Sequence, residues 1–234
     1  MNEPLPPRKR TGCVGQGCLI VAIAAILGIG VFGVGGWWIY NNVVSRYTSD
    51  RPADVRIEQP TPDTVQRARG KLERLQSAVR NRTEATIEFS AEDLNALLAS
   101  EAGFADMRGK VRVDFSGNDM ILDLSVSLAK VQLPKIRSRW FNGRVQFGVT
   151  YDQDGFSFDA KSLEVGGDRM EAGSGRGVAS SFLRSFSSSF TRSFNRSFHE
   201  GQNRNPGGRA FWKQIRTMSV QNGQLVVVTK AGEG

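Results

Sequence analysis

The chain has 234 residues, of which 39% are hydrophobic, and its formal net charge at pH 7 is +8. Its cysteines, Cys13 and Cys18, lie beside a hydrophobic segment, and its single histidine is His199. The rest of the chain therefore has no disulfide framework, no thiolate ligands and no set of histidines for a metal site, which argues against the common zinc, Cys/His and Ser/His chemistries.

The first predicted element is a membrane-spanning helix. Residues 11–45 carry no charged side chain, and residues 18–40 within them are apolar and long enough to cross the roughly 30 Å hydrocarbon layer of a bilayer. A cleaved signal peptide is the alternative, but this apolar core is too long, and no A-x-A cleavage site separates it from the aromatic residues at its end. Cys18 precedes the apolar stretch instead of following it, which argues against a lipoprotein.

The two ends of this span indicate its orientation. Aromatic residues, which favour the membrane–water interface, close its C-terminal end: Trp37, Trp38 and Tyr40. Basic residues 8–10 flank the other end, so the positive-inside rule places residues 1–17 in the cytoplasm as a basic tail. We therefore expect an integral, single-pass membrane protein whose chain after Tyr40 is extracytoplasmic.

A tether and an amphipathic helix are predicted next. Residues 41–60 are polar, and Pro52 and Pro60 discourage regular structure there. A helix is predicted over 61–82, with Thr61 as its N-cap and a proline at its first position. Its apolar residues form a narrow seam at steps of three and four residues: Val65, Ala68, Leu72, Leu75 and Val79. The seam either packs on the domain or pairs with a second copy as a short coiled coil.

Residues 83–234 are predicted to form an extracytoplasmic α+β domain. A short strand at 85–89 precedes a helix that Ser90 opens with a capping box. Glu92 and Asp93, in the first turn of that helix, resemble a pair of catalytic carboxylates. The favourable interaction of acids with the helix dipole explains them better.

Three hairpins follow, because apolar and polar residues alternate in a way that is typical of an antiparallel sheet with one buried face. The predicted strand pairs are 111–115 with 121–128, 145–151 with 156–158, and 218–220 with 225–228. The predicted fold class is therefore α+β, with an N-terminal transmembrane helix and then an antiparallel sheet of about six strands, packed on one face by amphipathic helices.

The most distinctive feature is a Ser-Phe pair that recurs every four residues in a helix predicted over 178–200. Each four-residue step advances about 40° beyond a full turn, so the five rings sweep about 160° of one side. These rings are Phe182, Phe186, Phe190, Phe194 and Phe198. The opposite side carries Arg184, Arg192 and Arg196.

Two interpretations of this helix compete. In one, the rings enter a membrane surface or line an acyl-chain groove while the arginines meet phosphates. In the other, which we favour, the rings cover the buried face of the sheet and the arginines face water. The two overlap, because a lipid chain can lie between a sheet and a loosely packed helix. We therefore predict the five phenylalanines as ligand contacts and the three arginines as contacts to an anionic partner.

Positive charge is concentrated around the same helix. From Arg176 to Arg216 the chain has eight basic residues and a single acid, Glu200. This concentration favours an anionic partner such as a phospholipid headgroup, an acidic polymer or a nucleic acid, although a solvated helix face explains it equally well. The predicted extracytoplasmic location argues against nucleic acid.

The order of these elements, with the motif Ser-Ala-Glu-Asp-Leu-Asn-Ala-Leu-Leu at 90–98 and the closing strand after Asn222-Gly223, resembles single-pass bacterial envelope proteins of uncharacterised function. These include YpmS-like proteins and, more loosely, tubular lipid-binding (TULIP-like) domains. The resemblance covers roughly residues 84–230 and implies a domain outside the bacterial inner membrane that binds lipid. It carries over no catalytic residue.

These observations predict a binding protein. The sequence shows no convergent acid, base or nucleophile cluster, so we expect no enzymatic activity, no cofactor and no metal. The first hypothesis is a membrane-tethered domain that binds lipid or another amphipathic ligand between the sheet and the phenylalanine-rich helix. The second is an envelope scaffold that engages a protein partner through its basic helix region.

Overall fold

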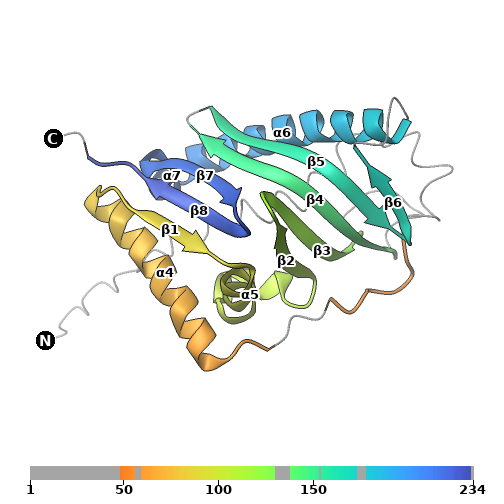
Figure 1. The fold of residues 1–234 in the computed structure, drawn as a ribbon, viewed down its shortest axis with the longest axis horizontal. Helices are drawn as coiled ribbons and strands as arrows, with labels where there is room; N and C mark the ends of the chain where they lie inside the picture. The colour runs from red at the N-terminus through yellow and green to blue at the C-terminus, as the bar shows by residue number, and fades with distance from the viewer. Residues whose placement is uncertain (1–47, 56–58, 130–137, 153, 173–177, 233–234) are drawn as a thin grey trace, which may run out of the picture.

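The computed structural model describes residues 48–55, 59–129, 138–152, 154–172 and 178–232 (Figure 1). Its helices are α4 (Pro62–Asn81), α5 (Ala91–Ser100), the 3-10 helix η1 (Ala102–Met107), α6 (Val178–Arg204) and α7 (Pro206–Gln214). Its strands are β1 (Thr86–Phe89), β2 (Val111–Ser116), β3 (Asp119–Ser127), β4 (Trp140–Asp152), β5 (Gly155–Val165), β6 (Asp168–Glu171), β7 (Ile215–Gln221) and β8 (Gln224–Thr229). The predicted α+β class is confirmed.

The strands form one antiparallel sheet that divides at β4. One edge of β4 pairs with β5, which in turn pairs with β6. The other edge is shared, since residues 140–147 pair with β3 while Thr150 and Tyr151 pair with β7. From β4 the sheet therefore continues as two arms, β3–β2 and β7–β8–β1 (Figure 1).

The sheet has eight strands, against about six predicted. The three predicted hairpins are present, and the short strand predicted at 85–89 joins the same sheet as β1, beside β8. The strand missing from the prediction is β6, whose side chains are all exposed or half-buried and show no apolar alternation. It pairs with β5 through a tight turn in which Gly166 and Gly167 have φ of 62° and 86°, which suits a type I′ hairpin.

The predicted helix starts are confirmed. The Thr61 hydroxyl accepts a hydrogen bond from the Thr64 N–H at 3.2 Å, and Ser90 and Asp93 form the complete capping box of α5. The seam of α4 packs on the domain, because Ala68, Leu75 and Val79 belong to its core. The phenylalanine-rich helix runs four residues beyond its predicted end at 200, up to Arg204.

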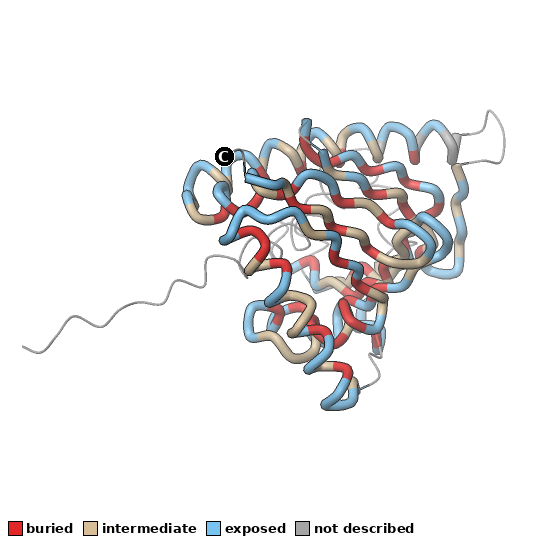
Figure 2. The backbone as a smooth tube through the Cα atoms, turned by 60° about the vertical axis from the view of Figure 1, so that its left-hand side comes forward, coloured by how far each residue is buried: buried red, intermediate tan, exposed pale blue. Residues whose placement is uncertain are grey.

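The core lies on one face of the sheet. Cross-strand partners such as Leu122 and Val145, or Val149 and Phe158, are buried on this face. The opposite face is polar and carries, for example, the ion pair of Arg144 with its cross-strand neighbour on β3. Figure 2 shows the resulting alternation of buried and exposed positions along the strands. Helices α5 and α6 contribute buried side chains to this core.

Part of the predicted tether is bound to the sheet. Ser49 and Trp140 exchange backbone hydrogen bonds of 2.8 and 2.7 Å. The Ala53 N–H donates to the Ser125 hydroxyl at 3.1 Å and to the Asn142 side-chain oxygen at 3.0 Å. Residues 48–55 of the predicted tether are therefore attached to the sheet, because polar side chains on β3 and β4 provide acceptors that the composition of the segment does not reveal.

The predicted transmembrane helix at 18–40 lies outside the described residues. Within the part of the chain that the structure describes, no helix is long and apolar enough to span a membrane.

Candidate functional site

Helix α6 runs along the open edge of β5 (Figure 1). β6 covers only residues 162–165 of that edge, and among the described residues no strand pairs there with the backbone of residues 156–160. Side chains of α6 provide the acceptors instead. The bonds run from Ala160 N–H to Ser187 Oγ (2.8 Å), from Phe158 N–H to Thr191 Oγ1 (3.2 Å) and from Phe156 N–H to Asn195 Oδ1 (2.9 Å).

The spacing of these bonds explains the four-residue repeat. Four helical residues advance about 6 Å, and two strand residues advance about 6.6 Å, so one step of the repeat matches one step along β5. Each acceptor directly follows a phenylalanine in sequence. Sequence analysis found the rings but missed these acceptors, although a Ser, Thr or Asn after each of three successive rings is a readable signal.

The described rings of the repeat are buried against β5. Phe190, Phe194 and Phe198 are 5%, 0% and 6% exposed. The Phe194 ring lies 4.8 Å from that of Phe156 and 5.0 Å from that of Phe158, centroid to centroid. Packing of this helix on the sheet, the interpretation we favoured, is therefore confirmed for these three rings. The side chains of Phe182 and Phe186 lie outside the described part of the structure.

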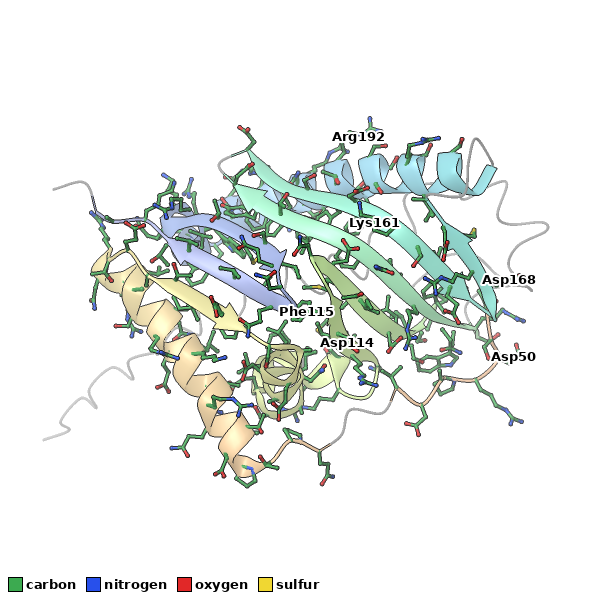
Figure 3. All side chains as sticks on the ribbon, viewed as in Figure 1. Asp50, Asp114, Phe115, Lys161, Asp168 and Arg192 are labelled. Atoms are coloured by element: carbon green, nitrogen blue, oxygen red, sulfur yellow. The ribbon has the colours of Figure 1, made fainter. Side chains whose placement is uncertain are left out.

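The outer side of α6 is basic, as the repeat predicts. Arg184, Arg192 and Arg196 are exposed, and none forms an ion pair with another residue that the structure describes. Figure 3 shows Arg192 on the outer side of α6. Basic side chains on α4 behave in both ways: Arg67, Arg69 and Lys71 form ion pairs, whereas the exposed Arg74 and Arg80 form none with a described residue. The structure thus brings the three predicted arginines together on one exposed surface, which we call the basic face of α6.

The hydrogen bonds between the β5 edge and the α6 side chains can be tested at Asn195. This side chain also donates to the Phe156 carbonyl at 2.8 Å, so Asn195→Ala removes two hydrogen bonds and leaves the part-buried backbone N–H of Phe156 without its acceptor. We expect a loss of about 1–3 kcal/mol in the free energy of unfolding and faster amide exchange at Phe156, measured by hydrogen–deuterium exchange of the full chain in detergent micelles. Arg196→Ala, at the adjacent exposed position, is the control. Equal amide exchange at Phe156 in the two variants would show that the Asn195 side chain does not protect this edge.

A second feature lies where the C-terminal end of α6 meets α7 and the β7–β8 pair. Here the structure has a pocket of about 220 Å³. Its aromatic and aliphatic lining comes from Tyr151, Phe198, Trp212 and Ile215, and its polar lining from His199, Gln202, Lys213 and Lys230. Of these residues, sequence analysis singled out Phe198 as a ligand contact. The others come from α6, α7, β4, β7 and the end of β8, so no local spacing connects them.

Trp212 packs among the other aromatic residues that line this pocket. It is 2% exposed, and its ring lies 5.1 Å from the rings of both Tyr151 and Phe198. The Tyr151 hydroxyl donates to the Trp212 carbonyl oxygen at 3.2 Å. Burial, and then the charge of Asp152, raise the pKa of Tyr151, so this hydroxyl stays a donor at neutral pH. Among the described residues, no acceptor lies within hydrogen-bond distance of the buried Trp212 Nε1–H.

The paired carboxylates at 92 and 93 are held in ion pairs with α4. The Asp93 carboxylate, which is 0% exposed, accepts from Lys71 Nζ at 2.6 Å and from Arg67 Nε at 3.1 Å. The Glu92 carboxylate contacts Arg67 Nη2 at 2.8 Å. This arrangement joins two helices. The described residues contain no group of three or more His, Cys, Asp or Glu that could hold a metal ion.

Comparison of the chain with protein-family models, with curated proteins and with solved structures finds no match. The resemblance to YpmS-like envelope proteins therefore stays a prediction, and the function has to be argued from the residues themselves.

Proposed function

We propose that this protein is a single-pass, non-enzymatic envelope protein whose extracytoplasmic domain binds an acidic protein partner through the basic face of α6. The observation that supports this proposal is that the two sides of α6 have different surroundings. Its described rings are buried against β5, while Arg184, Arg192 and Arg196 are exposed and have no ion pair among the described residues.

The same division favours a protein over a lipid bilayer. A helix that binds a membrane surface places its apolar side among the acyl chains. In α6 the described part of that side is occupied by the sheet, so its outward contacts are arginine and serine side chains. Such a surface suits an acidic polypeptide, which it attracts electrostatically and orients along the helix.

The length of α6 indicates the extent of the partner. The three arginines of the basic face lie within an arc of about 120°, at 100° of rotation per residue. From Arg184 to Arg196 the helix rises about 18 Å, the length of about five extended residues. An acidic segment of at least that length spans the basic face.

The membrane anchor makes such a contact effective. In this proposal the helix at 18–40 holds the domain at the outer surface of the inner membrane. The eight residues from the end of the span to Thr48, where the described domain begins, reach less than about 30 Å. Confinement to this layer raises the local concentration of the domain for neighbours in the same membrane, so individually weak ion pairs suffice.

The proposal is tested with the full chain in nanodiscs of zwitterionic lipid, with an oligoglutamate of about ten residues as the probe, which is long enough to span the basic face. We expect saturable binding that weakens with salt. The variant R184Q/R192Q/R196Q should bind about threefold to one-hundredfold more weakly, since each exposed ion pair contributes about 0.2–1 kcal/mol.

The matched control is R74Q/R80Q/R112Q, which removes the same charge from exposed arginines on α4 and β2. Equal loss in both variants would show that net charge, and not the basic face of α6, governs binding. Nanodiscs of anionic lipid provide the other arm. If α6 becomes protected from hydrogen exchange there, and oligoglutamate has no effect in zwitterionic discs, the partner is the bilayer and the proposal is wrong.

A further inference from the structure

The face of the sheet opposite the core carries carboxylates without ion pairs. We call four of them the acidic face of the sheet: Asp114 on β2, Asp119 on β3, Asp152 on β4 and Glu164 on β5. None forms an ion pair with another described residue, and Asp114 and Asp152 are exposed. Two cations on this side of the sheet, Arg144 and Lys161, are already paired with other acids there. Among the described residues of β2 to β5, Arg112 is the cation that remains, so unpaired carboxylates are in excess.

The register of the sheet spreads these carboxylates along β4. Glu164 lies level with residue 144 of that strand, Asp114 with residue 146 and Asp119 with residue 148. The fourth carboxylate belongs to residue 152 of β4 itself. These even-numbered positions alternate with the buried positions 145, 147 and 149, so all four carboxylates lie on the polar side of the sheet. From level 144 to level 152 the strand extends about 26 Å.

The arginines of the basic face of α6 lie at the same levels. Side chains of residues 187, 191 and 195 bond to positions of β5 that pair with residues 147, 149 and 151 of β4. A helix rises about 1.5 Å per residue and a strand about 3.3 Å, so Arg184 lies level with about residues 145–146 of β4. By the same measure Arg192 and Arg196 lie level with about residues 149–152. A second copy whose strands run parallel to those of the first can therefore meet these arginines with carboxylates at matching levels.

We propose that the acidic partner of the basic face of α6 is the acidic face of the sheet on a second copy of this chain. The inference rests on the proposed function, because it names the partner of that same surface. Copies anchored in one membrane share one orientation, which lets their strands run parallel. Because the two surfaces differ, the contact is heterologous, and its repetition links copies into a ring or a row within the membrane.

The test uses the full chain in vesicles of zwitterionic lipid, with donor or acceptor dyes on its cysteines, Cys13 and Cys18. We expect energy transfer between copies above that of randomly mixed labels, weakened by salt and by an excess of the oligoglutamate probe. The levels match Arg184 with Asp114, and Arg196 with Asp152. R184E/R196E and D114K/D152K should therefore each weaken association by about twofold to thirtyfold, since each variant loses two exposed ion pairs.

Charge complementation identifies the two surfaces. When donor-labelled R184E/R196E is mixed with acceptor-labelled D114K/D152K, transfer should return, because the intact acidic face of the first variant meets the intact basic face of the second. The matched control E73K/D106K makes the same charge change at exposed positions of α4 and η1 and should associate like the wild-type chain. Circular dichroism checks the fold of each variant, and D114N/D152N replaces D114K/D152K if that variant misfolds.

Three results would overturn the inference. Transfer no greater than random mixing, while oligoglutamate still binds saturably, would mean that the acidic partner is a different protein and would leave the proposed function in place. Loss of transfer in both variants without its return in their mixture would mean that the two surfaces do not contact each other. Equal loss in E73K/D106K would mean that net charge governs association. The proposed function fails separately, if oligoglutamate does not bind the chain.

Discussion

Replacing Phe194 with alanine is expected to lower the free energy of unfolding by about 3–5 kcal/mol. The ring is 0% exposed and packs against four other aromatic rings: Phe156, Phe158, Phe190 and Phe198. Alanine would leave a cavity between α6 and β5, and the hydrogen bonds on both sides of this position prevent the helix from closing it. Denaturant unfolding of the full chain in micelles, followed by far-ultraviolet circular dichroism, measures the loss.

Phe115→Ala is the matched control, since it removes the same side chain from a half-buried position on β2 (Figure 3). Its cost should be clearly smaller. The comparison also separates the two interpretations of the phenylalanine repeat. If the rings of α6 line a loosely packed groove for acyl chains, Phe194→Ala should cost no more than Phe115→Ala and should instead reduce the lipid that co-purifies with the chain in native mass spectrometry.

The repeat shows what a sequence pattern can and cannot predict. The four-residue period predicts the helix, its aromatic side and its basic side, because helical geometry alone determines them. The period does not identify the surface that the rings cover. The edge of β5 becomes available because β6 is short, and β6 follows a Gly-Gly turn and shows no apolar alternation.

Sequence analysis could not predict the pocket at the end of α6, for a different reason. Trp212 and Lys230 are eighteen positions apart, and a backbone hydrogen bond between the end of α7 and the end of β8 brings their surroundings together. The bound segment 48–55 was missed in the same way, since its partners Ser125 and Asn142 lie on the polar side of the sheet. Long-range pairing between polar groups leaves no periodic signal in the chain.

Asp93 is the second residue whose replacement is expected to lower the free energy of unfolding strongly. Asp93→Ala removes the acceptor for Lys71 and Arg67 and opens the capping box of α5. Removing one partner of a buried ion pair typically costs 3–5 kcal/mol, and loss of a cap adds to this. Because both cations are partly exposed and regain hydration, we expect about 3 kcal/mol in denaturant unfolding. Glu73→Ala, an exposed acid on α4, should change stability by less than about 0.5 kcal/mol.

The pH dependence of unfolding separates this role from simple packing. Burial alone would raise the pKa of Asp93, but hydrogen bonds from Lys71, from the Ser90 N–H and from Arg67 outweigh burial and hold the pKa below its usual value. A carboxyl with a lower pKa in the folded state binds fewer protons there, so its contribution is complete above the unfolded pKa of about 3.9 and is lost as the pH falls through the lowered folded value. The wild-type chain should therefore lose stability relative to Asp93→Asn as the pH is lowered below about 4, so the gap in the free energy of unfolding between the two proteins narrows. A gap that stays constant from neutral pH to pH 3 would show that the Asp93 charge does not hold α4 against α5.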